Sequence, residues 1–397
     1  MKRVYIITTL TCLVILTAFI VCFHMLNLSG GKENLKVGFI YDNDESTPYT
    51  YNFSLAKDEL EKKYGERVEI LTCSNVLDDE MEEPLRELAG KGCDIIFFNG
   101  YSDLVMKLAP ENPDVQFCQT SYMDMSDKTV PDNYHTFKGE AYQGRYVSGI
   151  AAGMKIRQMI QEKILTEDEA FVGFVAAFPT SEVISGYTAF LMGARSVVPT
   201  VQMRVYYTET WSSYAQEKSA AKKLIDDGCV IISQYTDTIG PAIACEEASQ
   251  KTRVYFVGFD QSMSEVAPGT SLVTARICWE QYVLAAVQAI MLNKSIESAV
   301  AGTVRGTDAF AGFENGWIEM LDLNRQVAAF GTQEAMDAAI EKFKRGNVDF
   351  VFKGDYRGVN PEDPSDTCDL QNGYIENEKT SYPLFHYVLE DIITIVN

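Results

Sequence analysis

Seven residues of this chain have side chains that suit a small planar solute, and each lies where an apolar segment gives way to polar residues. They are Tyr49, Asn52, Tyr101, Phe178, Trp211, Asp237 and Asp260. Flat aromatic rings stack on planar ligands, and such a pair adds about 0.5–1.5 kcal/mol beyond the burial of its area. Carboxylates accept hydrogen bonds from hydroxyl and ring N–H groups, and amides both donate and accept. The set therefore predicts a binding site for a planar ring that carries hydroxyl groups.

Each of these residues also has a purely structural explanation. An aromatic such as Tyr49 or Trp211 can fill a hydrophobic core, and Asp260 can cap a helix N-terminus. Catalysis is not expected, because the sequence has no GxSxG, HExxH or Walker pattern. His135 and His386 are the two histidines after residue 30, and we interpret His135 as structural or cleft-lining. We therefore expect no catalytic residue, no metal site and no cofactor.

The elements that would position these residues form a pattern that occurs twice. An apolar segment that contains Val37 is followed 55 residues later by Gly92 and a second apolar segment, and Val172 and Gly228 repeat this arrangement over 56 residues. Near-continuous apolar segments separated by helices are typical of a parallel sheet covered on both faces. Two such α/β lobes form a cleft, and ligands bind there at the carboxyl ends of the strands.

The lobes can be assigned along the chain. We expect strands at residues 35–41, 68–72, 94–99, 115–121, 170–176, 202–207, 230–233, 253–258 and 272–277, with helices between them. Lobe 1 comprises residues 35–135 plus 277–303, lobe 2 comprises residues 136–276 plus 304–355, and residues 356–397 form a polar C-terminal extension. A long helix at residues 140–161 contains Gly144, Gly149 and Gly153. Glycine lowers helix propensity, so we explain these residues by close packing against a sheet.

The composition limits the possible partners. The chain of 397 residues is long enough for two domains and an extension, and its 46% hydrophobic content argues against disorder. A formal net charge of −22 without a Lys/Arg cluster excludes binding to nucleic-acid polymers. The seven cysteines after residue 30 show no CxxC spacing, and several lie in apolar strands. We interpret them as buried hydrophobic residues rather than a disulfide framework.

Residues 1–30 have the pattern of a membrane segment. Lys2 and Arg3 precede an apolar run at residues 4–28, and about 20 apolar residues are enough to span a bilayer. The run lacks a small-x-small cleavage site, which favours an uncleaved anchor. Cys22 keeps a lipoprotein open, although Val21 is not the small residue that a lipobox needs. The positive-inside rule then places the chain after about residue 30 on the extracytoplasmic face of the cell membrane.

Several stretches together carry a family resemblance. They are EAYQGRYVSGIAAG at residues 140–153, Trp211 with QEK at 216–218, residues 220–228, QYTDT at 234–238 and VGFD at 257–260. Over residues 37–354 the chain resembles the basic membrane protein family of solute-binding proteins, which includes purine nucleoside receptors. The resemblance implies a type I periplasmic-binding-protein fold with two doubly wound parallel-sheet lobes and a hinged cleft. It also implies a nucleoside or related purine as ligand and an ABC permease as partner.

The resemblance assigns roles to some positions and leaves others open. Trp211 falls where the family often has a base-stacking aromatic, Asp260 where it has a ribose-binding Asp, and Asn52 at a similar helix start. The first-lobe loop departs from the family, because DNDESTPY at residues 42–49 replaces a Gly- and Asp-rich loop. Some members carry a Lys near the position where this chain has Arg276 and Trp279.

Two functions of different classes follow from this reading. The leading hypothesis is an extracytoplasmic solute-binding protein that captures a nucleoside-like solute for an ABC importer. The favoured solute is a purine. The alternative is a membrane-anchored ligand-sensing module that uses the same cleft and is coupled to a signalling partner. An enzyme is the least favoured class, and the soluble part is expected to be monomeric.

Overall fold

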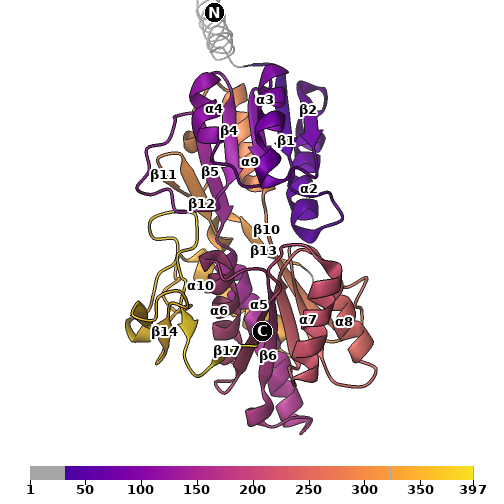
Figure 1. Cartoon of the computed structure of the whole chain (residues 1–397). Coiled ribbons are helices and arrows are strands. Elements are labelled where there is room, and N and C mark those ends of the chain that lie inside the picture. The colour runs from indigo at the N-terminus through magenta and orange to yellow at the C-terminus, as the bar shows by residue number, and fades with distance from the viewer. Residues whose placement is uncertain (1–31, 322, 397) are drawn as a thin grey trace, which may run out of the picture.

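The first lobe is built on a seven-stranded sheet. The computed structural model describes residues 32–321 and 323–396, and Figure 1 shows two lobes stacked end to end. The strand order in the first sheet is β11 (Thr303–Arg305), β12 (Asp308–Ala311), β5 (Tyr134–Gly139), β4 (Gln116–Thr120), β3 (Ile95–Phe98), β1 (Leu35–Ile40) and β2 (Val68–Cys73). Neighbouring strands run parallel except for the antiparallel pair β11 and β12.

Helices cover both faces of this sheet, because successive side chains of a strand point to opposite faces. The helices are α2 (Pro48–Tyr64), α3 (Glu82–Gly90), α4 (Val105–Glu111) and α9 (Glu280–Met291). Phe39 and Phe97 belong to the core cluster beneath α2 and α9. Ile96 and Phe98 point the other way and pack with the residues of α3 and α4.

The second lobe repeats this plan. Its strand order is β13 (Ile318–Met320), β10 (Ser271–Ile277), β9 (Tyr255–Phe259), β8 (Ile231–Tyr235), β6 (Phe171–Ala176), β7 (Gln202–Tyr207) and β17 (Ile393–Ile395). Its main helices are α5 (Ala141–Gln161), α6 (Ser181–Arg195), α7 (Tyr214–Asp226), α8 (Gly240–Ala248) and α10 (Thr332–Lys344). Only β13 runs antiparallel to its neighbour in this described sheet.

The pairing register confirms that the two lobes share one topology. Val37 of β1 pairs with Ile95 of β3, and Val172 of β6 pairs with Ile231 of β8. Each of these central strands has its next strand in sequence on its other side, β2 for β1 and β7 for β6. The predicted α/β architecture of two parallel-sheet lobes is therefore confirmed.

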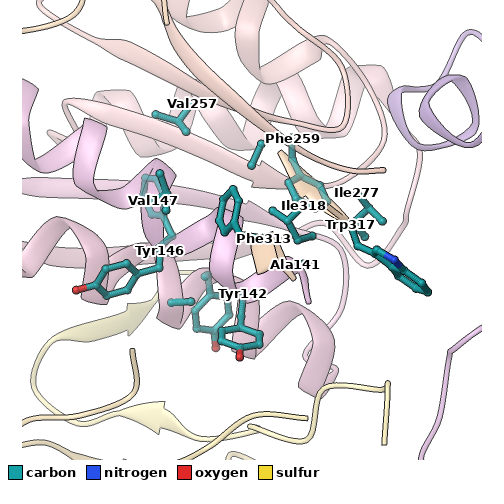
Figure 2. Close-up of a cluster of buried hydrophobic side chains, with 14 of the residues drawn as sticks. Ala141, Tyr142, Tyr146, Val147, Val257, Phe259, Ile277, Phe313, Trp317 and Ile318 are labelled. Atoms are coloured by element: carbon teal, nitrogen blue, oxygen red, sulfur yellow. The ribbon is translucent and has the colours of Figure 1, made fainter. Parts of the chain in front are cut away.

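The chain crosses between the lobes three times, and the crossings lie side by side. They follow β5, β10 and β12. A Cβ atom on Gly139 would lie 2.7 Å from Cγ2 of Ile277 and 3.1 Å from Cδ1 of Ile318. Figure 2 shows Ile277, Ile318 and Phe313 in one buried cluster with the first turn of α5. The three crossings thus form one apolar hinge.

The observed crossings correct the predicted lobe boundaries. The predicted breaks at 135/136 and 303/304 fall inside β5 and β11, both of which belong to the first sheet. Thr136 and Phe137 still pair with Gln119 and Thr120 of β4, and β5 also pairs with β12 up to Gly139. The first lobe therefore includes residues 134–139 and 303–311, which complete the far edge of its sheet.

Residues 356–396 are more ordered than a polar extension suggests. They form a small antiparallel sheet of β14 (Arg357–Val359), β15 (Thr367–Asp369) and β16 (Val388–Leu389), followed by β17. Because β17 pairs with β7, it becomes the edge strand of the second sheet. In Figure 1 this yellow segment runs beside α6 and α10 and reaches the junction of the lobes.

The predicted anchor at residues 1–30 lies outside the described residues. Among residues 32–321 and 323–396, no helix combines the length and the apolar character needed to cross a bilayer.

Helix α5 is buried on almost every side, and its glycines allow this. A Cβ on Gly149 would lie 2.0 Å from the carbonyl oxygen of Phe190 in α6, and a Cβ on Gly193 would lie 2.0 Å from that of Tyr146. Gly144 instead faces Ala275 in the sheet. The expectation that these glycines pack against a sheet is therefore correct for Gly144 and wrong for Gly149, which packs against a helix.

We predict that Gly149→Ala destabilises the protein by about 1–3 kcal/mol or more, because the added methyl group must separate two packed backbones. The free energy of unfolding in urea measures this. Gly90→Ala is the matched control, since a Cβ there meets nothing within 4 Å. That variant should be neutral or up to about 1 kcal/mol more stable. Equal stability of the two variants would contradict the close approach of α5 and α6.

Candidate functional site

A cavity of ≈ 170 Å³ lies between the lobes at the carboxyl ends of both sheets. The first lobe contributes polar and aromatic residues that follow β1, β3 and β4, and the second lobe contributes residues that follow β7, β8 and β9. Among them are Asp42, Tyr49, Tyr101, Tyr122, Trp211, Tyr235, Asp237 and Asp260. The position agrees with the general rule for open parallel sheets, because loops at this end of each strand meet in the cleft.

Five of the seven predicted site residues line this cavity: Tyr49, Tyr101, Trp211, Asp237 and Asp260. Among the described residues, Asn52 and Phe178 do not belong to its lining. Phe178 packs edge-on against Trp211, with ring centroids 5.7 Å apart. Its position supports Trp211 from behind rather than offering a surface to a ligand.

The aromatic residues of the cavity are held in different ways. Trp211 is 39% exposed, and its carbonyl oxygen accepts a hydrogen bond of 2.8 Å from the backbone N–H of Asp237. The Tyr49 hydroxyl lies 3.2 Å from Oγ1 of Thr120. Tyr101 donates to Asp103 at 2.7 Å. Trp211 and Tyr101 are therefore exposed to a similar extent, while both tyrosine hydroxyl groups are bound within the first lobe.

Asn52 joins the two lobes instead of facing the cavity. Its side chain is fully buried. Its Nδ2 donates to Oδ1 of Asp260 and to the carbonyl oxygen of Ile277, each at 2.9 Å. Its Oδ1 accepts from Nη1 of Arg276 at 3.2 Å. The amide of a first-lobe helix thus fixes the orientation of a second-lobe carboxylate that lines the cavity.

Burial controls the charge of the cavity carboxylates. Asp260 has φ of +64° directly after β9, a left-handed conformation that Asp tolerates better than most residues. Burial raises its pKa to about 7, although the Arg145 charge opposes this shift. Burial also raises the pKa of Asp237 well above its usual range, and the neighbouring Asp42 and Asp260 charges add to this effect.

The carboxyl groups of Asp237 and Asp42 differ in the number of hydrogen bonds that the protein donates to them. Oδ1 of Asp42 accepts from Thr50 Oγ1 at 3.0 Å and from the Asn43 N–H at 2.8 Å. The Asp237 carboxylate has no hydrogen-bond partner in the described part of the chain, although its backbone N–H is used. A half-buried carboxyl group without a hydrogen-bond partner favours a ligand that donates hydrogen bonds.

Five charged residues of the cavity lining were not predicted as site residues, namely Asp42, Asp78, Lys138, Arg145 and Glu182. Lys138 and Glu182 form an ion pair of 2.7 Å between the lobes. Arg145 is 1% exposed and lines the same cavity. Lys138 lies in β5, which the sequence pattern did not indicate as a strand, and Arg145 and Glu182 lie on helices. A search restricted to strand ends does not reach these three.

Two residues that the sequence analysis discussed do not serve the cavity. His135 lies outside it, and Arg276 is already paired with a carboxylate. His135 contacts Glu297 at 2.7 Å and Gln116 at 2.8 Å, outside the cavity lining, so its role is structural. Arg276 is bound by Glu280 at 2.7 Å. Trp279, three residues further along the chain, is buried and does line the cavity.

We predict that the protonation of Asp260 couples stability to pH. Its pKa is 3.8 when unfolded and about 7 when folded, so its contribution is complete below pH 3.8 and is lost as the pH rises to about 7. The loss is at most about 4 kcal/mol. Urea unfolding between pH 4.5 and 8 should show the wild-type protein losing stability relative to Asp260→Asn, which cannot titrate.

The exposed Asp349 provides the control, because Asp349→Asn should follow the wild-type protein at every pH. A constant difference between Asp260→Asn and wild type across this range would contradict the raised pKa of Asp260.

Comparisons with known proteins agree with this architecture. A curated relative, a purine-binding protein of Brucella abortus, is 29% identical over 75% of this chain and 78% of its own length. A Haloferax volcanii protein named as an ABC transporter glucose-binding protein is 27% identical over 67% of this chain and 59% of its own length. A solved ABC-transporter solute-binding protein of Conexibacter woesei superposes with a TM-score of 0.60 at 18% identity, covering 79% of this chain and 97% of that one.

The type I periplasmic-binding-protein fold predicted from the resemblance is thereby confirmed. The family model described as ABC transporter substrate-binding protein PnrA-like matches residues 35–342. This family consists of binding proteins for ABC transport rather than enzymes. With two like lobes, a triple hinge and an interlobe cavity, the chain belongs to the PnrA-like family of ABC-transporter substrate-binding proteins.

Proposed function

We propose that this protein captures a purine nucleoside or a closely related solute outside the cytoplasm and delivers it to an ABC permease. The observation that carries the proposal is the cavity itself. It places Tyr49 of one lobe and Trp211 of the other around a space that also contains the Asp237 and Asp260 carboxylates. Aromatic surfaces suit a purine ring, and carboxylates suit the hydroxyl groups of a sugar.

The site residues have distinct roles in this proposal. Trp211 stacks on the base, supported by Phe178, and Tyr49 and Tyr101 close the cavity from the first lobe. Asp237 and Asp260 accept hydrogen bonds from the ligand. Asn52 acts indirectly, because it orients Asp260 across the hinge. The purine-binding relative from Brucella abortus supports the same ligand class.

The cellular arrangement is part of the proposal. The soluble part acts as a monomer, and residues 1–30 anchor it at the extracytoplasmic face of the cell membrane. The apolar run at residues 4–28 supports such an anchor.

A ligand-sensing module coupled to a signalling partner is the second candidate. It is favoured by the C-terminal extension, which lies beyond the end of the family match at residue 342 and contacts both lobes. The two candidates share one ligand site, so they differ only in the partner that recognises the closed form.

The test is a thermal-shift screen of the full chain in detergent against nucleosides, free bases, sugars and amino acids. A ligand at 100 times its Kd adds about 2.7 kcal/mol of stability. We expect purine nucleosides to raise the melting temperature and sugars and amino acids to leave it unchanged. A response to glucose without a response to any nucleoside would overturn the proposed ligand class.

We predict that Trp211→Ala weakens binding of the active nucleoside by about 5- to 150-fold, since stacking of a base on an aromatic ring contributes about 1–3 kcal/mol. Isothermal titration calorimetry measures the change. Tyr214→Ala is the control, because Tyr214 is a nearby exposed aromatic outside the cavity lining. If both variants bind like the wild-type protein, Trp211 is not part of the site.

A further inference from the structure

Arg145 is a charged residue of the cavity whose hydrogen bonds the protein does not provide. It lies in α5 and is 1% exposed. Its guanidinium carbon lies 3.7 Å from the ring centroid of Phe259 and 4.5 Å from that of Tyr235. None of its three side-chain nitrogens has a hydrogen-bond partner within the described chain. The side chain is therefore held by aromatic faces and left with unused donors.

The charge on Arg145 persists at neutral pH. Burial lowers its pKa to about 10, which still leaves the guanidinium protonated. Nearby carboxylates are engaged by other groups, because Glu182 pairs with Lys138 and the Tyr235 hydroxyl, and Asp260 accepts from Asn52. Arginine has donors and no acceptor, and a buried charge without partners is strongly unfavourable. The missing partner is a hydrogen-bond acceptor that arrives with the ligand.

The environment of Arg145 limits the kind of acceptor group that a ligand can present to it. Asp42, Asp237 and Asp260 line the same small cavity, and burial raises the pKa of all three carboxyl groups. Negative charge is therefore unfavourable in this cavity, which disfavours a phosphate group. A neutral acceptor such as a carbonyl oxygen or a ring nitrogen meets no such penalty. An arginine fork matches the O6 and N7 acceptors of guanine, whereas adenine presents an amino donor at position 6.

We propose that Arg145 makes this site selective for purine nucleosides with an oxo group at position 6. This inference rests on the proposed function and deepens it. The guanidinium donates to O6 and N7, and the Asp237 carboxyl group, which has no other hydrogen-bond partner among the described residues, accepts from a ring N–H. An adenine in this position would keep N7 as an acceptor, but its amino group would face the guanidinium and leave one donor of Arg145 without an acceptor. A site built to make a buried hydrogen bond rejects a ligand that cannot complete it.

The experiment compares inosine with adenosine by calorimetry, because the two differ at position 6 and in the N1 proton that this position determines. We expect the wild-type protein to bind inosine at least tenfold more tightly. Arg145→Met should reduce this preference to within about threefold, mainly by weakening inosine. Arg157→Met is the matched control, since Arg157 is an exposed arginine on the same helix. It should keep the wild-type preference.

Each outcome separates this inference from the broader function. Binding of both nucleosides with equal affinity, or a preference that survives Arg145→Met, overturns the role of Arg145 and leaves the nucleoside function intact. Tighter binding of inosine 5′-monophosphate than of inosine also overturns it, because the charge argument then fails. Absence of binding to every purine nucleoside overturns the proposed function itself. Unfolding curves of each variant confirm that a change in preference comes from a folded protein.

A second inference rests on an independent feature, the loop at residues 376–385, which we term the interlobe loop. In the first lobe, Oδ2 of Asp308 accepts from the backbone N–H of Ser381 at 2.7 Å and from Thr380 Oγ1 at 3.2 Å. In the second lobe, Ser181 Oγ donates to the carbonyl oxygen of Pro383 at 2.8 Å. The loop therefore binds both lobes without being one of the three covalent crossings.

The buried polar groups inside the interlobe loop also have hydrogen-bond partners. Glu376 is 3% exposed. Its carboxylate accepts from the backbone N–H of Leu384 at 2.6 Å and from Ser185 Oγ at 2.6 Å. Thr380 and Ser381 are almost fully buried at the junction. Separation of the lobes would expose these groups and break the bonds to Asp308.

We infer that the interlobe loop holds the cleft in its closed arrangement. Small-angle X-ray scattering of the unliganded full chain in detergent tests this without any ligand. Asp308→Ala should shift the scattering of the protein part toward a larger maximum dimension, because the loop loses its first-lobe acceptor. Asp366→Ala is the control, since Asp366 binds His386 and Asn360 within the extension. Identical scattering from Asp308→Ala and wild type, with folding confirmed by circular dichroism, would overturn the inference.

Discussion

The arrangement of the whole molecule depends on the close contact of its three interlobe crossings. Gly139 has no side chain, and this lets the first crossing lie against Ile277 and Ile318 of the other two. Three parallel connections permit the lobes to bend about a line and restrict their rotation against each other. The carboxyl ends of the two sheets therefore face one another, and residues that follow the equivalent strands β3 and β8, such as Tyr101 and Asp237, meet in one cavity.

Closure of the cleft is stabilised by polar pairs with one member in each lobe. Asn52 binds Asp260, and Lys138 binds Glu182. When the lobes separate, water replaces these partners, so each pair contributes only the difference between protein and water hydrogen bonds. Such a difference is about 0.5–1.5 kcal/mol for a neutral pair and larger when a charge is involved. The closed form is thus favoured by a modest amount, which a ligand or a further contact can change.

The architecture could be predicted from the sequence because strands of a parallel sheet that is covered on both faces are nearly continuous apolar segments, and this pattern occurs twice in the chain. The strand-end rule also brought Tyr49, Trp211, Asp237 and Asp260 to one place. It misjudged Asn52, because a side chain at a helix start can turn toward the hinge instead of the cavity, and only the packing of α2 against β10 decides this. Nothing in the local pattern marked β5 as a strand, since its sequence YHTFKG contains no apolar run. The ammonium group of Lys138 is buried with two partners, the carbonyl oxygen of Ser121 and the carboxylate of Glu182 in the other lobe.

The contacts of the C-terminal extension and of the buried cations Lys138 and Arg145 could not be predicted from the sequence either, because the residues that surround them are far away along the chain. Ser381 and Asp308 are 73 residues apart, and Thr136 binds the same carboxylate across 172 residues. A short polar segment has no periodicity that reveals such contacts. Sequence patterns report which face of an element is apolar, and they do not report which polar groups a fold brings together across its hinge.

The distribution of recognition groups over the lobes also suggests an order of events. Arg145 and the aromatic rings that hold it, Tyr235 and Phe259, all belong to the second lobe, as do Trp211 and Asp237. Their mutual geometry does not depend on the hinge angle, so this lobe is pre-organised even when the cleft is open. The first lobe contributes Tyr49 and Lys138, and the contact of Lys138 with Glu182 of the second lobe exists only when the cleft is closed. A ligand can therefore bind the second lobe first, and closure then adds the first-lobe contacts and removes water from the remaining hydrogen bonds. In this order the ligand supplies the acceptor that Arg145 lacks before the lobes close over it.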